Sequence, residues 1–133
     1  MATSNHRRRG RLALGSSLLL TLCACGDDSC DIETYTRDRA GIGAMDCNAS
    51  PDVELIRDCI LQQSSAQHPF RAIFPRGEDS YQGIVGTGHT FYTQRPAGGG
   101  IEEAECAQLE DVSIEGHQQM QCADPGDYSM VCE

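Results

Sequence analysis

The chain has 133 residues, eight cysteines, 5% aromatic residues and a formal net charge of −10. A chain of this length folds as one domain at most, and its cysteine content predicts that cross-links replace part of a hydrophobic core. Such cross-links need an oxidising compartment, which argues against the cytosol. The negative charge disfavours nucleic acids and polybasic membrane contact, and it leaves basic proteins or cationic ligands as partners.

The first 24 residues have the layout of a signal peptide. Residues 1–11 hold four arginines and no acid, and residues 12–24 are mostly apolar. A membrane-spanning helix needs about 20 apolar residues, and Asp27 and Asp28 follow too early for that length. Cleavage before Cys25 would leave six arginines against twenty acidic residues, a net charge of −14.

The end of the apolar stretch reads Leu22-Cys23-Ala24-Cys25, an aliphatic residue, a free position, a small residue and a cysteine. This pattern resembles the lipobox of bacterial lipoproteins. The resemblance covers about the first quarter of the chain. It implies cleavage after Ala24, transfer of a diacylglycerol to the Cys25 thiol and acylation of the new N-terminus. Cys23 is the poorer candidate, because Leu22 would then occupy the position that needs a small side chain.

The resemblance also implies a location. Each buried methylene contributes about 0.8 kcal/mol, so two or three acyl chains would hold the protein stably in a bilayer. Gly26 stands where the retention signal of enteric lipoproteins has an aspartate, which favours the outer membrane of the bacterial cell envelope. The part of the chain after the anchor resembles small cysteine-containing lipoproteins of unknown function in layout alone, so that likeness implies no functional residue.

The sequence therefore divides into three parts. Residues 1–24 are the predicted signal peptide, and residues 25–46 are a lipidated N-terminus that continues as a tether and loop, because they show little hydrophobic periodicity. Residues 47–133 are the predicted disulfide-containing domain.

The clearest predicted element in that domain is an amphipathic helix over residues 51–64. Ser50 can cap its start and Pro51 suits its first position. The apolar side chains recur at helical spacing, and they are Val53, Ile56, Cys59 and Ile60.

Alternating patterns and glycine-rich or proline-rich breaks predict strands over residues 70–74, 80–87 and 90–94. Residues 101–109 fit a strand or a short helix, and the preceding meander favours the strand. Residues 122–132 predict a small terminal hairpin. The expected fold class is α+β, with one amphipathic helix packed on an antiparallel sheet of three to four strands and no predicted cover on the other face.

Loss of Cys23 and lipidation of Cys25 leave an even set of six cysteines. They are Cys30, Cys47, Cys59, Cys106, Cys122 and Cys132. Three disulfides have fifteen connectivities, and the preferred one joins Cys30 to Cys47, Cys59 to Cys106 and Cys122 to Cys132.

Other chemistry has weaker support, and neither a cofactor nor a metal site is predicted. A zinc or redox site is disfavoured because no Cys-x-x-Cys pair is present. The acids between Glu102 and Glu115 could collect calcium, but they lack an EF-hand pattern, so a solvated acidic face is favoured. Residues 83–88 resemble a phosphate loop superficially, and strand packing explains their glycines better.

No catalytic constellation stands out. The candidate groups for a hydrolase lie in or near predicted loops or lack the context of a nucleophile: they are His68, His89, His117, Ser80 and Ser113. Tyr81, Phe91 and Tyr92 are expected to pack on the helix or to form a binding patch on the open sheet face. The favoured function is a non-catalytic binding or structural module of the cell envelope. The alternative is a small periplasmic hydrolase or an enzyme inhibitor.

Overall fold

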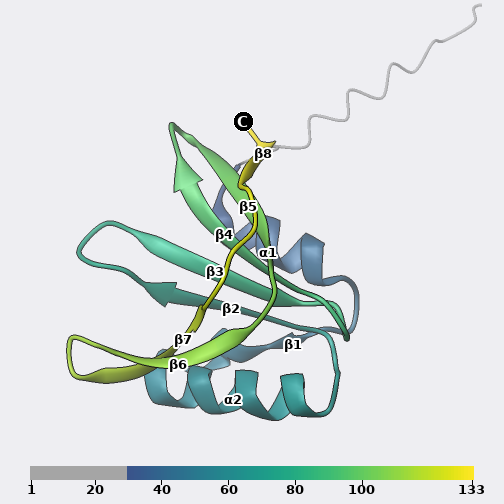
Figure 1. The fold of residues 1–133 in the computed structure, drawn as a ribbon, viewed down its shortest axis with the longest axis vertical. Helices are drawn as coiled ribbons and strands as arrows, with labels where there is room; N and C mark the ends of the chain where they lie inside the picture. Colours follow the sequence, from purple (N-terminus) through teal and green to yellow (C-terminus); the bar gives the residue numbers. More distant parts are fainter. Residues whose placement is uncertain (1–29) are drawn as a thin grey trace, which may run out of the picture.

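Two helices cover opposite faces of a six-stranded sheet in the computed structural model, which describes residues 30–133 (Figure 1). The helices are α1 (Ile32–Ala40) and α2 (Val53–Ser65), with a short 3-10 helix η1 (Cys47–Ala49) between them. The strands are β1 (Met45–Asp46), β2 (Phe70–Pro75), β3 (Tyr81–Gly86), β4 (Phe91–Ala97), β5 (Gly100–Cys106), β6 (Leu109–Ile114), β7 (His117–Cys122) and β8 (Ser129–Cys132).

The main sheet has the order β1-β2-β3-β4-β5-β8, and β6 and β7 form a separate two-stranded sheet. Neighbouring strands are antiparallel except for the β1–β2 pair. The predicted α+β class is confirmed. The predicted count of three to four strands is too low, because it covers β2 to β5 but omits β1 and β8 of the main sheet and the separate pair β6 and β7.

Helix α2 confirms the predicted helix, with its start moved slightly. Asp52, not Ser50, is the cap, and its Oδ1 accepts a hydrogen bond from the Glu54 amide at 2.9 Å. The Ser50 hydroxyl instead accepts one from the Asp52 amide at 3.2 Å. Ile56 and Ile60 turn inward and are almost completely buried.

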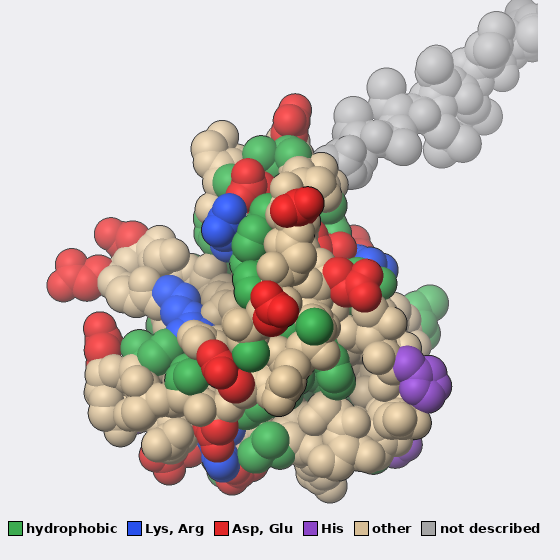
Figure 2. Space-filling model, in the orientation of Figure 1, with side chains coloured by type: hydrophobic (Ala, Val, Ile, Leu, Met, Phe, Trp, Pro, Cys, Tyr) green, Lys and Arg blue, Asp and Glu red, His purple; other side chains and the backbone are tan. Residues whose placement is uncertain are grey.

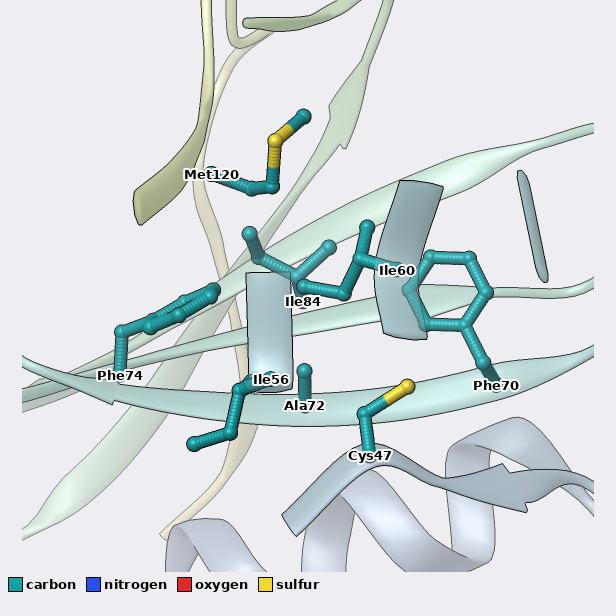
Figure 3. Packing of buried hydrophobic residues seen from close by; sticks show 8 residues of the cluster. All are labelled: Cys47, Ile56, Ile60, Phe70, Ala72, Phe74, Ile84 and Met120. Atoms are coloured by element: carbon teal, nitrogen blue, oxygen red, sulfur yellow. The ribbon is translucent and has the colours of Figure 1, made fainter. Parts of the chain in front are cut away.

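The apolar core lies between α2 and the sheet (Figure 3). Alternate residues of β2 point into it because successive strand side chains face opposite ways. The buried side chains of the cluster are Cys47, Ile56, Ile60, Phe70, Ala72, Phe74, Ile84 and Met120. Gly86 leaves room for the Phe70 ring, because a Cβ at Gly86 would lie 2.4 Å from Phe70 Cε1. A core this small needs the support of cross-links.

The expectation of a tether and loop through residue 46 is wrong for Ile32–Ala40, which form α1. Asp31 caps this helix by accepting a hydrogen bond from the Thr34 amide at 2.8 Å. Glu33 lies in its first turn and Arg37 in its last, the arrangement that complements the helix dipole. The helix covers the second sheet face, which had no predicted cover.

The C-terminal third also differs from the prediction. The choice of a strand for the segment after residue 100 is confirmed by β5. The terminal hairpin is wrong, because β7 pairs with β6 through a turn in which Glu115 and Gly116 have positive φ angles of 51° and 81°. The chain then crosses back and β8 pairs with β5.

All six cysteines of the described chain form disulfides, as predicted, but each preferred pair is wrong. The bonds join Cys30 to Cys132, Cys47 to Cys59 and Cys106 to Cys122. The return of β8 to β5 brings Cys132 to the start of α1, while the hairpin brings Cys122 back to the end of β5. Helix α2 is therefore bonded to η1 rather than to the sheet.

Candidate binding clefts

The second sheet face carries polar side chains that meet α1, and Arg71 lies at their centre. Arg71 follows Phe70 in β2, so its side chain points away from the apolar core. Its Nη2 atom lies 2.8 Å from Asp46 Oδ2 and 3.9 Å from Glu33 Oε1. The Arg71 side chain is only 6% exposed, whereas that of Asp46 is 48% exposed. A buried cation is thus held by a carboxylate that still contacts solvent.

Two open clefts meet at this ion pair, and Arg71 and Asp46 line both of them. The larger cleft has a volume of about 650 Å³ and is bounded by the end of α1 and by residues 41–44. The smaller has a volume of about 380 Å³ and lies toward Pro51, Val53 and Tyr81. The clefts combine apolar walls with a fixed charged group, the composition common in ligand sites.

The loop beside the larger cleft presents an apolar side chain to solvent. Gly41 and Gly43 have φ angles of 88° and 83°, which non-glycine residues rarely adopt. The turn that they form leaves Ile42 fully exposed. Met45, at the start of β1, is also exposed. Ile42, which lines the cleft, can therefore supply an apolar contact to a bound partner.

A second polar cluster surrounds Glu103, which is 9% exposed. Its carboxylate accepts hydrogen bonds from Tyr35 at 3.2 Å, from Arg39 at 3.1 Å and from Gln94 at 2.9 Å. The Arg39 guanidinium also lies 4.0 Å from the centre of the Tyr92 ring. These contacts attach α1 to β4 and β5.

The same contacts move the pKa values of Tyr35 and Arg39 further from neutral pH. Burial, followed by the charge and hydrogen bond of Glu103, raises the pKa of Tyr35 to about 12. Burial would lower the pKa of Arg39, but its interactions with Glu103 and Tyr92 together outweigh burial and leave that pKa raised. The arrangement suits a fixed binding surface better than proton transfer, which needs a group that titrates near the working pH.

One of the four tyrosines should therefore ionise late in a titration followed by phenolate absorbance. The folded Tyr35 keeps its proton to about pH 12, while an unfolded tyrosine loses its proton near pH 10. Between about pH 10 and 12 the folded state binds more protons, so stability should fall as the pH rises through this window.

Tyr35→Phe should remove the late titration step, and Glu103→Gln should move it to lower pH. Because burial is the larger cause of the shift, Glu103→Gln should not restore the ordinary value completely. A Glu103→Gln variant with an unchanged late step would show that Glu103 does not act on Tyr35.

The residues proposed for hydrolysis do not come together. His68 follows α2, His89 lies in the β3–β4 turn and His117 starts β7, and all three are exposed. Ser80 and Ser113 are exposed on other segments. Residues 83–88 run along β3 into a turn where Gly88 has a φ of 108°, which agrees with the packing explanation.

The acids between Glu102 and Glu115 are not one solvated face. Glu103 is buried, Glu102 pairs with Arg95 at 2.9 Å, and Asp111 pairs with Arg57. The hydrogen bonds that Arg57 donates to Asp111 lower the pKa of the Asp111 carboxyl group. Within residues 30–133, no group of three or more His, Cys, Asp or Glu side chains is placed to hold a metal.

The aromatic residues divide between the predicted roles. Phe91 packs against the apolar core, Tyr92 lies under Arg39 of α1, and Tyr81 is half exposed at one end of the smaller cleft. They do not form one patch. The sequence analysis did not identify Arg71 and Asp46 as site residues. One signal was available: Asp31 can cap a helix by accepting a hydrogen bond from the Thr34 amide, and that helix, α1, packs over the sheet face that carries Arg71.

The proposed lipidation site, Cys25, lies outside the described residues. Neither helix in the described range is long and apolar enough to span a bilayer. Comparisons of the chain with protein-family models, with curated proteins and with solved structures found no match.

Proposed function

We propose that the protein is a lipid-anchored, non-catalytic binding module of the bacterial cell envelope. Residues 1–24 direct export, Cys25 carries the lipid, and the domain from Cys30 onward binds a basic protein or a cationic ligand. The outer membrane is the proposed location.

The pairing of the cysteines is the observation that carries this proposal. The six cysteines from Cys30 onward bond with one another, so the folded domain does not use the Cys25 thiol. Three disulfides also fit a protein that folds after export to an oxidising compartment. Cys25 is therefore left for acylation.

The disulfide between Cys30 and Cys132 gives the anchor a structural consequence. Five residue steps separate Cys25 from Cys30, and a fully extended chain spans at most about 3.6 Å per residue. Cys30 would thus lie within roughly 18 Å of the acylated residue. The end of the domain formed by β8 and the start of α1 would then be the end closest to the membrane (Figure 1).

Two features favour binding over catalysis. The buried ionisable side chains are held in ion pairs, Arg71 with Asp46 and Arg39 with Glu103. The histidines of the described domain are exposed on separate elements. The expected charge of −14 for the processed chain favours a basic or cationic partner.

Replacement of Cys25 with serine should release the protein from the membrane fraction or leave it unprocessed. The physical reason is the loss of two or three acyl chains, each of which contributes about 0.8 kcal/mol per buried methylene. Cell fractionation with immunodetection measures this.

Cys23→Ser is the matched control, because it makes the same change two residues earlier and leaves the pattern at Ala24 and Cys25 intact. It should remain in the membrane fraction. Retention of Cys25→Ser in the membrane, with normal processing, would contradict the proposal.

A further inference from the structure

The two edges of the main sheet differ in how they are protected. At one edge, β1 contributes just two residues. The side chain of Asn48 continues the pairing beyond it. Asn48 Nδ2 donates to the Ile73 carbonyl at 2.9 Å, and the Ile73 amide donates to Asn48 Oδ1 at 2.7 Å. This side chain occupies the backbone groups through which another strand would pair.

The opposite edge is β8, and it has no comparable protection. Within residues 30–133, the backbone of β8 pairs with β5 alone, so the outward edge of β8 has no strand partner there. Met130 and Val131 are 43% and 39% exposed. Natural edges are usually blunted by short length, charged residues or proline. β8 is short, at four residues, but it is longer than β1 and has neither a charged residue nor a proline among the four. In β6, by contrast, Glu110 and Asp111 supply such charges.

An open groove of about 460 Å³ lies beside β8, next to the β4–β5 turn. Gly98 and Gly99 form part of its wall, and Met130, Glu102 and Glu133 line it. Arg95 already pairs with Glu102, whereas Glu133 has no ion pair within residues 30–133. Figure 2 shows apolar and acidic side chains interspersed over the end of the molecule that carries β5 and β8.

We propose that the β8 edge binds an extended, basic segment of a partner protein, which adds a strand to the sheet. Backbone hydrogen bonds to β8 would provide affinity, and Met130 and Val131 would supply apolar contacts. A lysine or arginine of the partner would enter the groove beside Glu133. This inference rests on the proposed binding function and adds a surface separate from the two clefts at Arg71, and it does not depend on the lipid anchor.

Charge favours this occupant over a second copy of the chain. Two processed chains of −14 each repel one another, and the acidic groove would face a second acidic surface. A basic segment is attracted to the same surface, and its association should weaken as the salt concentration rises.

A labelled synthetic peptide in which lysine and valine alternate is a suitable probe. The full chain is first extracted from membranes in a non-ionic detergent and is then added in increasing amounts to the labelled peptide. Fluorescence anisotropy of the peptide measures binding. The same peptide with alternate backbone amides methylated lacks the donors that a β ladder needs. We expect the methylated peptide to bind at least tenfold more weakly.

Met130→Lys and Leu55→Lys form a matched pair of variants. Both residues are exposed, at 43% and 53%, so neither change should unfold the domain, and both add one positive charge. Leu55 lies on α2, away from β8. Met130→Lys should weaken binding of the peptide about tenfold, and Leu55→Lys should change it less than twofold.

Equal binding of the methylated peptide would overturn strand addition, and an equal effect of the two lysine variants would overturn the location. Absence of binding by the unmodified peptide at low salt would overturn the choice of a basic extended partner. Self-association of the chain that Met130→Lys abolishes would assign the edge to a second copy instead. Each of these results can occur with Cys25→Ser still releasing the protein from the membrane, so failure here is separable from failure of the anchor.

Discussion

Replacing Cys30 and Cys132 together with serine is expected to destabilise the domain by about 4.7 kcal/mol, the chain-entropy value for a loop of ~100 residues. The two cysteines are 102 residues apart and enclose almost the entire described chain. A small domain has a net stability of about 5 to 15 kcal/mol, so the double variant should be close to unfolded. Denaturant unfolding followed by circular dichroism measures the change.

The matched control is the pair Cys106→Ser and Cys122→Ser, which opens a bond with a sequence separation of 16. Its expected cost is about 3 kcal/mol, because a shorter loop restricts the unfolded chain less. A smaller loss of stability in the Cys30 and Cys132 variant than in this control would contradict the account of the long-range bond as the main cross-link.

Asp46→Asn is expected to destabilise the domain by about 2 kcal/mol, the range for losing a hydrogen bond to a charged group. The cost stays below that of a pair with both members buried, because the Asp46 side chain is 48% exposed. The substitution leaves the Arg71 guanidinium buried with no carboxylate nearer than Glu33 Oε1 at 3.9 Å. Arg71→Met should cost less than about 1 kcal/mol, because it fills the same space and leaves Asp46 in contact with solvent. The asymmetry follows from which partner is buried.

The double variant completes the cycle, and it should be about as stable as Arg71→Met alone. Urea unfolding of the four proteins measures the coupling. Equal costs for the two single variants would show that Arg71 is not the buried member of the pair, and strictly additive costs would show that Arg71 and Asp46 do not interact.

The parts of the fold that obey a simple hydrophobic period could be predicted from the sequence. Helix α2 buries Ile56 and Ile60 on one stripe, and β2 alternates Phe70 and Phe74 with outward residues, so both patterns are visible without a structure. Helix α1 could not be found in this way, because the face it buries against the sheet includes Thr36 and pairs Arg39 with Glu103. A helix stabilised by polar contacts has no apolar stripe to recognise.

The site and the disulfide pairing depend on long-range order in the sheet. The sequence places Arg71 in an alternating strand, but its partner Asp46 comes from β1, whose parallel pairing with β2 has no local signal. Cys132 reaches Cys30 because β8 crosses back to β5 and not to its sequence neighbour β7. The spacing of the cysteines along the sequence favoured disulfides between neighbours such as Cys122 and Cys132. The return of the chain to β5 instead places Cys132 beside Cys30.

The central claim, that this domain is carried on an acylated Cys25, has one direct measurement: the intact mass of the full-length chain extracted from bacterial membranes. The account predicts a polypeptide that begins at Cys25, carries a diacylglycerol with or without an amide-linked acyl chain, and has three disulfides. A mature chain with an unmodified N-terminus, or one that begins at any residue other than Cys25, would contradict it.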